Sequence, residues 1–243
     1  LEKGLFRDGT PDDRITFSAG YDYKEYDEDD QMIVLLKDYF NKVQTEVDMR
    51  EYILTLLATY LDGHITEQKF IIWTGVGANG KSTTVELLQA AMGDYFGTIP
   101  ITLLTKKRGS SSAASPELSS TRGKRFVVFQ EPENDDKIHV GHMKELTGND
   151  KISARGLFKE PIEFYPQFKT VLTCNKLPLI PSNDGGTWRR LRVVPFEIKF
   201  VENPVQKNER KIDKTLKQKL EKWTQPFISI LLERFRIYKK NKF

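Results

Sequence analysis

A glycine-rich segment after an apolar stretch carries the most specific chemical signal in the sequence. Residues 75–82 read Gly-Val-Gly-Ala-Asn-Gly-Lys-Ser, the pattern G-x-x-x-x-G-K-S, and follow the apolar residues 70–73. Glycines let backbone N–H groups close around phosphate oxygens because no Cβ blocks the approach. In such a loop the lysine reaches the β- and γ-phosphates and the serine ligates Mg²⁺. The pattern predicts a P-loop that binds a nucleoside triphosphate.

The residues of this loop and of the turn after it are the expected phosphate ligands. They are Gly75, Gly77, Ala78, Asn79, Gly80, Lys81, Ser82 and Thr83. The amphipathic run that begins at Lys81 predicts a helix, and the positive end of that helix points at the same phosphates.

Phosphoryl transfer also needs a carboxylate at the end of a neighbouring buried strand, where it holds magnesium through water or polarises the attacking water. Residues 124–129 predict such a strand, and Glu131 and Glu133 follow it. Glu131 is the first candidate, also for magnesium, and Glu133 is the second. Gln130 stands where the usual pattern has another acid, so the division of roles between the two glutamates stays open.

Two further kinds of polar group fit the same chemistry. The apolar residues 168–174 predict a strand that ends at Asn175, whose amide can hydrogen-bond the attacking water or a γ-phosphate oxygen. Arg189, Arg190 and Arg192 lie close together in the chain. A guanidinium group is always charged and grips two oxygens at once, so an arginine from a neighbouring subunit often stabilises this transition state. A structural ion-pair role is the alternative.

Hydrophobic periodicity predicts the elements that position these residues. Apolar residues at helical spacing predict two helices within 32–61, and another over 213–238 that Pro226 interrupts. A strand, the loop and a helix fill 69–92, and a further strand is expected near 191–196. Residues 106–112 have loop composition. Strands alternating with helices behind a P-loop predict an α/β fold with a sheet covered by helices.

Composition excludes further classes of protein. The 243 residues have ordinary apolar and charged fractions and no apolar run long enough to cross a bilayer. The first residues do not form a signal-peptide pattern, so we expect neither a secreted nor a membrane protein.

A single cysteine, Cys174, excludes an internal disulfide. The pair His139 and His142 lacks partners at metal-ligand spacing, and we expect it to lie on the surface. The chain begins with Leu1, so we expect a fragment of a longer protein.

Taken in order, these motifs resemble those of the superfamily 3 DNA helicases. In particular they resemble the C-terminal helicase part of the primase-helicases of poxviruses and other large nucleocytoplasmic DNA viruses. The most specific motifs are Leu-Thr-Gly-x-Asp at 146–150 and Asn-Lys-Leu-Pro at 175–178. The segments that carry the resemblance are 77–83, 130–133, 144–150 with Arg155, 173–178 and 188–190.

The resemblance implies an AAA+-like P-loop ATPase with a central, mostly parallel sheet, preceded by a small helical segment. It implies ATP and Mg²⁺ as cofactors and a ring, usually a hexamer, around single-stranded DNA, with hydrolysis at subunit interfaces and unwinding from 3′ to 5′. Lys81 and Ser82 hold phosphate and magnesium, Glu131 is the acidic residue and Asn175 is the sensor. Arg190 is the first choice for the arginine that acts in trans, with Arg189 and Arg192 behind it.

The resemblance also implies a domain layout and partners. Residues 1–62 are the end of a preceding unit and a helical segment, 63–200 are the ATPase core, and 201–243 are a basic helical segment. A basic tail can follow a phosphate backbone, although a solvated helical face is commoner. Expected partners are other copies of the chain, an N-terminal primase part and replication proteins. The expected location is a viral replication site in the host cytoplasm or nucleus.

The segment after the Leu-Thr-Gly-x-Asp motif forms, by the same resemblance, a hairpin that projects into the ring and grips DNA. Its strands are expected at 152–157 and 161–165, with Phe158 and Lys159 near the tip. Lysine offers a phosphate contact and phenylalanine a stacking surface. The other expected DNA contacts are Lys151 and Arg155. An ordinary surface hairpin is the alternative.

Two other functions stay open at this point. One is a P-loop ATPase that spends hydrolysis on DNA packaging or remodelling. The other is a nucleotide-gated assembly module that does not unwind DNA. A helicase motor needs every motif described above, whereas each alternative needs only some of them.

Overall fold

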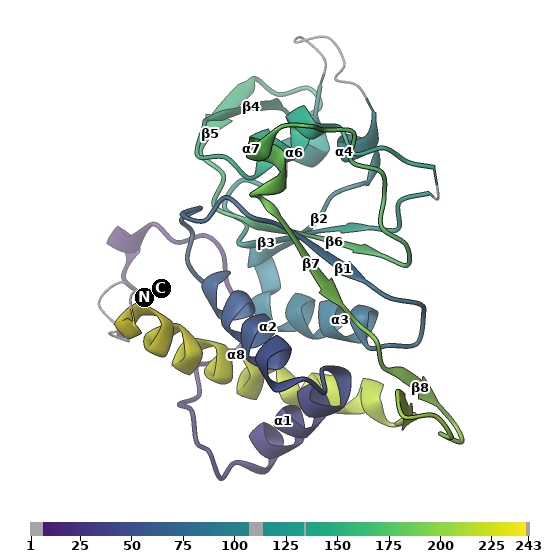
Figure 1. Cartoon of the computed structure of the whole chain (residues 1–243). Coiled ribbons are helices and arrows are strands. Elements are labelled where there is room, and N and C mark those ends of the chain that lie inside the picture. The colour runs from purple at the N-terminus through teal and green to yellow at the C-terminus, as the bar shows by residue number, and fades with distance from the viewer. Residues whose placement is uncertain (1–6, 107–113, 134, 242–243) are drawn as a thin grey trace.

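The computed structural model describes residues 7–106, 114–133 and 135–241. At its centre is a five-stranded parallel sheet in the order β2–β3–β6–β1–β7 (Figure 1). The strands are β1 (Phe70–Thr74), β2 (Phe96–Thr98), β3 (Phe126–Gln130), β6 (Lys169–Cys174) and β7 (Leu191–Pro195). The predicted α/β fold with a parallel sheet between helices is therefore confirmed. Of the predicted loop at 106–112, all but Lys106 lies outside the described residues.

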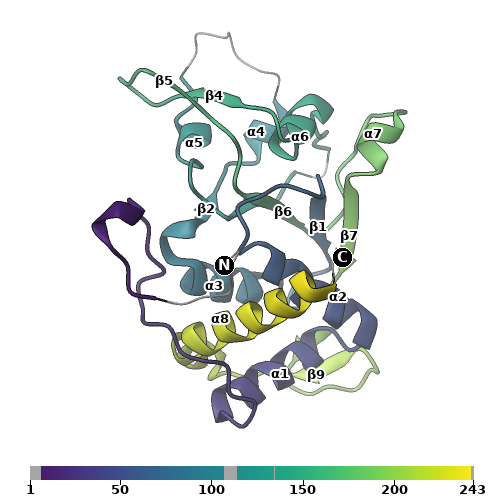
Figure 2. The ribbon, with the colours of Figure 1, turned by 90° about the vertical axis from the view of Figure 1, so that its left-hand side faces the viewer.

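Helices cover both faces of the sheet, as Figures 1 and 2 show from two sides. The long helices lie below it: α1 (Gln31–Val43), α2 (Val47–Thr59), α3 (Lys81–Met92) and α8 (Leu216–Asn241). The short helices lie above it: α4 (Thr102–Thr105), α5 (Pro116–Ser119), α6 (Val140–Leu146) and α7 (Gly185–Trp188). Two 3₁₀ turns, Pro11–Asp13 and Gly93–Tyr95, complete the helical elements of the described residues.

Alternation along the strands divides the interior into two apolar cores. On β1, Ile71 and Trp73 face the long helices, whereas Phe70 and Ile72 face the short ones. All four side chains are buried, as expected for a parallel strand that is covered on both faces. The helical segment before the P-loop and the C-terminal helix share one core with α3. The domain boundaries at 62 and 200 stay a prediction.

Helix α8 runs unbroken through Pro226, so the predicted interruption there is wrong. Proline removes one backbone donor and disfavours a helix interior. Here the carbonyl of Lys222, four residues earlier, belongs to an exposed residue that water can reach. On the inner side, Trp223, Phe227 and Leu231 are buried against the long helices. This packing keeps the helix continuous.

Two small two-stranded units stand apart from the central sheet. The antiparallel hairpin consists of β4 (Ile152–Arg155) and β5 (Pro161–Phe164), so its strands are shorter than expected. The second unit, β8 (Lys199–Val201) with β9 (Glu209–Lys211), was not predicted. None of the helices in the described residues is both long and apolar enough to cross a membrane.

The shared core predicts that α8 is required for stability. Phe227 is fully buried and stacks on Phe40 with ring centroids 5.6 Å apart. We expect Phe227→Ala to lower the free energy of unfolding by roughly 3 to 5 kcal/mol, because it leaves a cavity between α1 and α8. Chemical denaturation measures this change. Ile237→Ala, at an exposed position of the same helix, is the control and should change it by less than about 0.5 kcal/mol. Equal effects would contradict the packing described.

Candidate nucleotide and phosphoryl-transfer site

The glycine-rich segment joins the end of β1 to the start of α3. Its backbone adopts positive φ at Gly75 (149°), Gly77 (30°), Ala78 (52°) and Gly80 (90°). A Cβ at Gly75 would lie 2.3 Å from the carbonyl oxygen of Phe196, so only glycine fits there. The segment therefore makes a sharp turn between β1 and α3, and the first turn of α3 follows the loop directly.

Lys81 begins α3 and is almost completely buried. Its Nζ donates to the carbonyl oxygen of Gly75 and, at 3.2 Å, to Oδ1 of Asn79. Burial lowers the pKa of the Lys81 amine, while the nearby Cys174 and Glu131 act in the opposite direction. The amine thus lies over the loop and close to the acidic candidate Glu131.

The loop is braced from two sides by residues outside the motif. From α1, the Tyr39 hydroxyl donates to the carbonyl oxygen of Gly80 at 3.2 Å and lies 3.0 Å from the Thr84 hydroxyl. From the other side, the Phe200 amide donates to the carbonyl oxygen of Ala78 at 2.7 Å. Sequence reasoning missed Tyr39, because a tyrosine at helical spacing is indistinguishable from an ordinary core residue.

Glu131 and Asn175 lie at the same edge of the sheet as the loop. Their strands are neighbours, and the Glu131 amide donates to the carbonyl oxygen of Thr173 at 3.0 Å. The Thr74 hydroxyl, at the end of β1, donates to the carbonyl oxygen of Asn175 at 3.4 Å. Glu131 also has a positive φ of 49°, a strained conformation for a residue with a side chain. Such strain clusters at functional sites.

Glu133 takes a different position from Glu131. Both glutamates are exposed, but Glu133 lies in a turn, where its amide donates to Oδ2 of Asp136 at 2.9 Å. Glu131 directly follows β3, whereas Glu133 is two residues further from the sheet edge. The geometry therefore favours Glu131 over Glu133 for work at the loop.

The arginines lie at the opposite edge of the sheet from the loop. Leu191 at the start of β7 pairs with Phe70 at the start of β1, and Arg189 and Arg190 precede it. Arg190 donates to Oε1 of Gln68 at 3.2 Å. A strand of five residues at about 3.3 Å per residue separates them from the P-loop by roughly 16 Å. Arg189 and Arg190 therefore cannot act on a nucleotide in their own loop.

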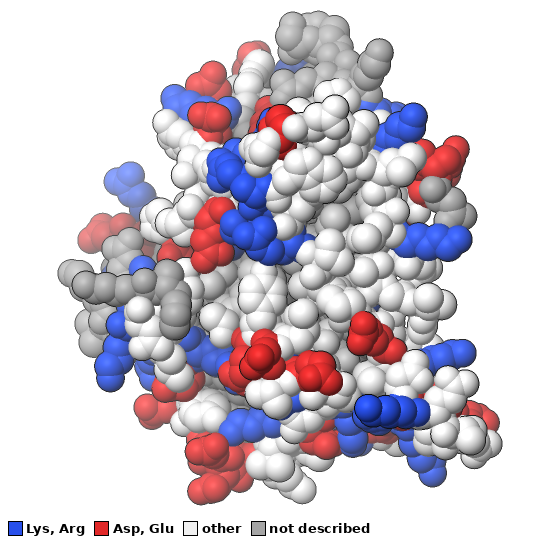
Figure 3. Space-filling view, viewed as in Figure 1, with Lys and Arg blue, Asp and Glu red and all other residues white. Residues whose placement is uncertain are grey.

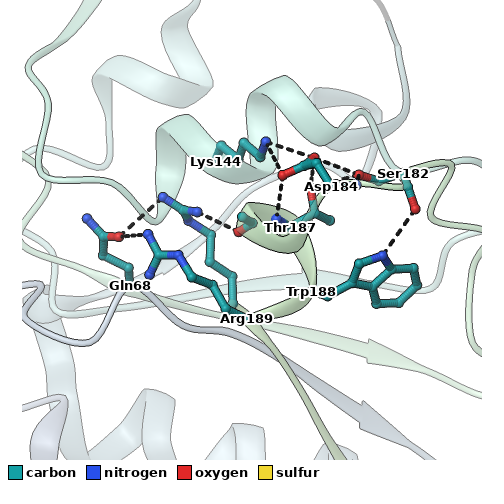
Figure 4. A network of polar contacts seen from close by, with 9 residues as sticks. Gln68, Lys144, Ser182, Asp184, Thr187, Trp188 and Arg189 are labelled. Carbon is teal, nitrogen blue, oxygen red and sulfur yellow. Dashed lines mark hydrogen bonds and ion pairs between the residues drawn. The ribbon is translucent and has the colours of Figure 1, made fainter.

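A compact polar network fixes these arginines, as Figure 4 shows. Asp184 precedes α7 and accepts hydrogen bonds from Lys144 at 3.0 Å, from the Ser182 hydroxyl at 2.7 Å and from the Thr187 hydroxyl at 2.7 Å. These donors hold the pKa of the Asp184 carboxyl well below its ordinary value. Arg190 donates to the carbonyl oxygen of Gly186, inside the helix that Asp184 caps, at 2.6 Å. The carboxylate therefore orients the helix that leads into the arginines.

Lysine and arginine side chains gather on the face where α7 and β7 lie (Figures 1 and 3). Arg189 and Arg192 are exposed there, and Arg190 is partly buried with an Nε that has no hydrogen-bond partner. Sequence reasoning missed Asp184, although aspartate is among the residues preferred at a helix N-cap.

The predicted hairpin is present, and its tip is exposed. Phe158 is fully exposed with a φ of 56°, and Leu157 beside it is 61% exposed. Lys159 is exposed as well. Lys151 forms an ion pair with Glu163 on the facing strand at 3.6 Å. Arg155 is partly buried at the end of β4. Phe158, Lys159 and Lys151 are thus exposed to solvent, whereas Arg155 is partly buried.

The expectation that the histidine pair lies on the surface is wrong for His142, which is buried, whereas His139 is partly buried. His142 is 6% exposed and donates from Nδ1 to the carbonyl oxygen of Leu103, and its ring lies 4.6 Å from that of His139. The contact holds α6 against α4. Among the described residues, no group of three or more His, Cys, Asp or Glu is placed to hold a metal ion.

The polar network predicts a selective effect on turnover. If Arg189 and Arg190 complete the loop of a neighbouring copy, we expect Asp184→Asn to lower the ATP hydrolysis rate by up to about a hundredfold, because the arginines would be displaced from that loop. ATP affinity should stay within about twofold, because the phosphate loop lies at the other sheet edge. Steady-state ATPase assays and ATP titration measure the two effects. Asp12→Asn, at an exposed position, is the control. Loss of ATP affinity in Asp184→Asn would contradict the separation of the two edges.

The chain is similar in sequence to a protein family and to several viral proteins. Residues 73–190 match a family described as "Family of unknown function (DUF5906)". The chain is 48% identical over 99% of its length to "Putative helicase L207/L206" of Acanthamoeba polyphaga mimivirus, and covers 26% of that protein. It is 35% identical over 70% of its length to "Putative helicase 022R" of Frog virus 3, covering 18% of it. It is 27% identical over 75% of its length to "Putative primase C962R" of African swine fever virus, covering 19% of it.

Solved structures show the same fold at low identity. The apo structure of the NrS-1 C terminal region (305–718) aligns with a TM-score of 0.64 at 14% identity, over 90% of this chain and 53% of that one. The chain spans about a quarter or less of the length of the viral relatives. The resemblance predicted from the order of the motifs is confirmed, and the chain is a relative of proteins named "Putative helicase" or "Putative primase" in large nucleocytoplasmic DNA viruses.

Proposed function

We propose that this chain is the motor part of an ATP-dependent DNA helicase in viral DNA replication. It hydrolyses ATP at the subunit interfaces of a ring, usually a hexamer, and moves 3′ to 5′ on single-stranded DNA. One observation carries the proposal: the phosphate loop with Glu131 and Asn175 lies at one edge of the sheet, and the arginines lie at the other. The names of the viral relatives support the same role.

Lys81, Ser82, Glu131 and Asn175 divide the work at the loop. Lys81 neutralises the β- and γ-phosphates, for which its position over the loop is suited. Ser82 is exposed in the first turn of α3 and offers a hydroxyl oxygen, the kind of ligand that Mg²⁺ prefers. Glu131 polarises the attacking water or holds magnesium through water. The Asn175 amide senses the γ-phosphate from the neighbouring strand.

Because Arg189 and Arg190 lie at the opposite edge of the sheet from the loop, the proposed site is shared between two copies of the chain. A site that needs an arginine, on a chain whose Arg189 and Arg190 lie about one strand length away from it, is completed by the next copy. Head-to-tail repetition of such an interface closes into a ring when the rotation allows it. Arg190 is the first choice for the completing residue, with Arg189 and Arg192 next to it.

The exposed hairpin supplies the contact with DNA. Phe158 is a stacking surface and Lys159 a phosphate contact, and both are exposed at the tip. Helix α6, which leads into this hairpin, carries Lys144, the partner of Asp184 beside the arginines. The same ion pair thus joins the DNA element and the arginine element.

Mixing two inactive variants tests the shared site. We expect Lys81→Ala and Arg190→Ala to be inactive alone and to regain ATPase activity when mixed. A Lys81→Ala copy still supplies its arginine to the intact loop of an Arg190→Ala neighbour. In a random equal mixture, half of the loops and half of the arginines are intact, so about one quarter of the interfaces are complete.

Arg122→Ala, at an exposed position outside the arginine group, is the control and should keep wild-type activity. Size-exclusion chromatography with light scattering confirms that the mixtures assemble. An assembled mixture without any regained activity would refute the action of Arg190 on a neighbouring subunit.

Replacing the hairpin tip tests the DNA contact. We expect Phe158→Ala with Lys159→Ala to weaken single-stranded DNA binding by roughly tenfold or more, because one stacking surface and one phosphate contact are lost. Hydrolysis without DNA should not change. Fluorescence anisotropy of labelled DNA and ATPase assays measure both effects. Lys222→Ala, an exposed lysine on α8, is the control. Unchanged DNA affinity with lost basal hydrolysis would overturn the hairpin assignment.

A further inference from the structure

The side chain of Gln68 joins Arg189 to Arg190. Gln68 lies two residues before β1, and its Oε1 accepts hydrogen bonds from Nη2 of Arg189 and, at 3.2 Å, from Nη2 of Arg190 (Figure 4). A guanidinium group only donates hydrogen bonds, so the amide oxygen of Gln68, and not its nitrogen, must face both arginines. The two guanidinium groups therefore converge on a single atom.

The residues that follow Gln68 hold the backbone of the same two arginines. Nζ of Lys69 donates to the carbonyl oxygen of Arg189 at 3.1 Å. The Phe70 amide donates to the carbonyl oxygen of Arg190 at 2.8 Å. The segment that enters β1 thus contacts both arginines at the backbone as well as at the side chain.

Arg192 is not part of this arrangement. Its Nη1 donates to the carbonyl oxygens of Arg189 and Leu191, at 3.3 and 2.7 Å. The contacts of Gln68 therefore distinguish Arg189 and Arg190, as a pair, from the third arginine of the group.

The backbone of Gln68 is strained. Its φ is 51°, in the left-handed region that residues with a side chain rarely adopt. Such conformations persist where the surrounding structure determines them, and they cluster at functional sites. A glycine would adopt this φ without strain but would leave the two arginines without a shared acceptor.

The shared acceptor is neutral, although a carboxylate would bind guanidinium groups more strongly. Burial and then the charge of Arg189 lower the pKa of the Arg190 guanidinium, and Asp184 acts in the opposite direction. Asp184 itself pairs with Lys144 at 3.0 Å. Gln68 thus orients two neighbouring cations and leaves their charge available to a phosphate group.

We propose that Gln68 is a positioning residue, which holds Arg189 and Arg190 as a pair against the nucleotide of the next copy and, being neutral, leaves their charge to its phosphate oxygens. The inference rests on the proposed function, because it takes the catalytic site as shared between copies. It makes both guanidinium groups, and not one alone, the groups that meet the phosphates. Gln68 acts only through the two arginines.

Two substitutions test the acceptor and its neutrality separately. Gln68→Met has a side chain of similar length without an acceptor, and Gln68→Glu keeps the acceptor and adds a negative charge. We expect each to lower kcat for ATP by roughly tenfold or more, the first because the arginines lose their position and the second because their charge is neutralised. ATP affinity, measured by titration, should stay within about twofold, because the loop lies at the other sheet edge.

Gln167→Met is the matched control, since Gln167 is an exposed glutamine two residues before β6, at the same edge of the sheet. It should keep the wild-type kcat. Thermal unfolding separates positioning from a merely structural role: Gln68→Glu still accepts from both arginines, so its Tm should equal or exceed that of the wild type while its kcat falls. Wild-type kcat in either Gln68 variant would overturn the proposal.

Mixing variants shows on which side of the interface Gln68 acts. Gln68→Met has an intact loop and displaced arginines, so it belongs with Arg190→Ala. We expect it to regain ATPase activity when mixed with Lys81→Ala, whose Gln68 and arginines are intact, and to regain none when mixed with Arg190→Ala. If Gln68→Met does not fold, Gln68→Glu takes its place in both mixtures.

The mixture of Lys81→Ala with Arg190→Ala is the reference. If the reference regains activity, a Gln68 variant that gains activity with Arg190→Ala, or gains none with Lys81→Ala, overturns the role of Gln68 and leaves the shared site in place. If the assembled reference regains none, the shared site is refuted and the role of Gln68 falls with it.

Discussion

The parallel pairing of β1 with β6 on one side and β7 on the other is the constraint on which the rest depends. Parallel strands end at a common edge, so one register places the glycine loop after β1, Asn175 after β6 and Glu131 after β3 side by side. The same register places the residues before β7 at the far edge. The glycine loop, Glu131 and Asn175 are thereby separated from Arg189 and Arg190 by the length of a strand, which favours the proposed site shared between copies.

Packing of the long helices below the sheet holds the glycine-rich loop rigidly in place. Helices α1, α2 and α8 share one core with α3, the helix that starts at Lys81. Tyr39 from α1 and Phe200 from β8 reach the carbonyl oxygens of the loop itself. Above the sheet, Asp184 joins α6 to α7 through Lys144. The glycine-rich loop and the helix that leads into the arginines are therefore each held by contacts between segments that are far apart in the sequence.

Local patterns were sufficient for β1, β3, β6, β7, the loop and the α/β fold, whereas the hairpin was predicted from the family resemblance and β2, β8 and β9 were not predicted. Each depends on short-range signals: apolar runs, glycines with positive φ, and turn residues. Residues that act through distant contacts were missed: Tyr39 carries no local signal, and Asp184 carries only that of a helix N-cap, which says nothing of its contact with Lys144. Pro226 and His142 were misjudged for the same reason. Burial against α1–α3 outweighs the local helix-breaking tendency of proline, and a backbone carbonyl on α4 satisfies a histidine that looked like a surface residue. The roles of Lys81, Glu131, Asn175 and the arginines stay predictions.

The most direct test of a shared catalytic site is the ATP hydrolysis rate per subunit, measured over a range of protein concentrations with and without single-stranded DNA. A site completed by a neighbouring copy requires assembly, so the rate per subunit should rise with concentration and rise further when DNA is added. A substantial rate that is the same at every concentration, down to dilutions at which light scattering shows only monomers, would contradict the account.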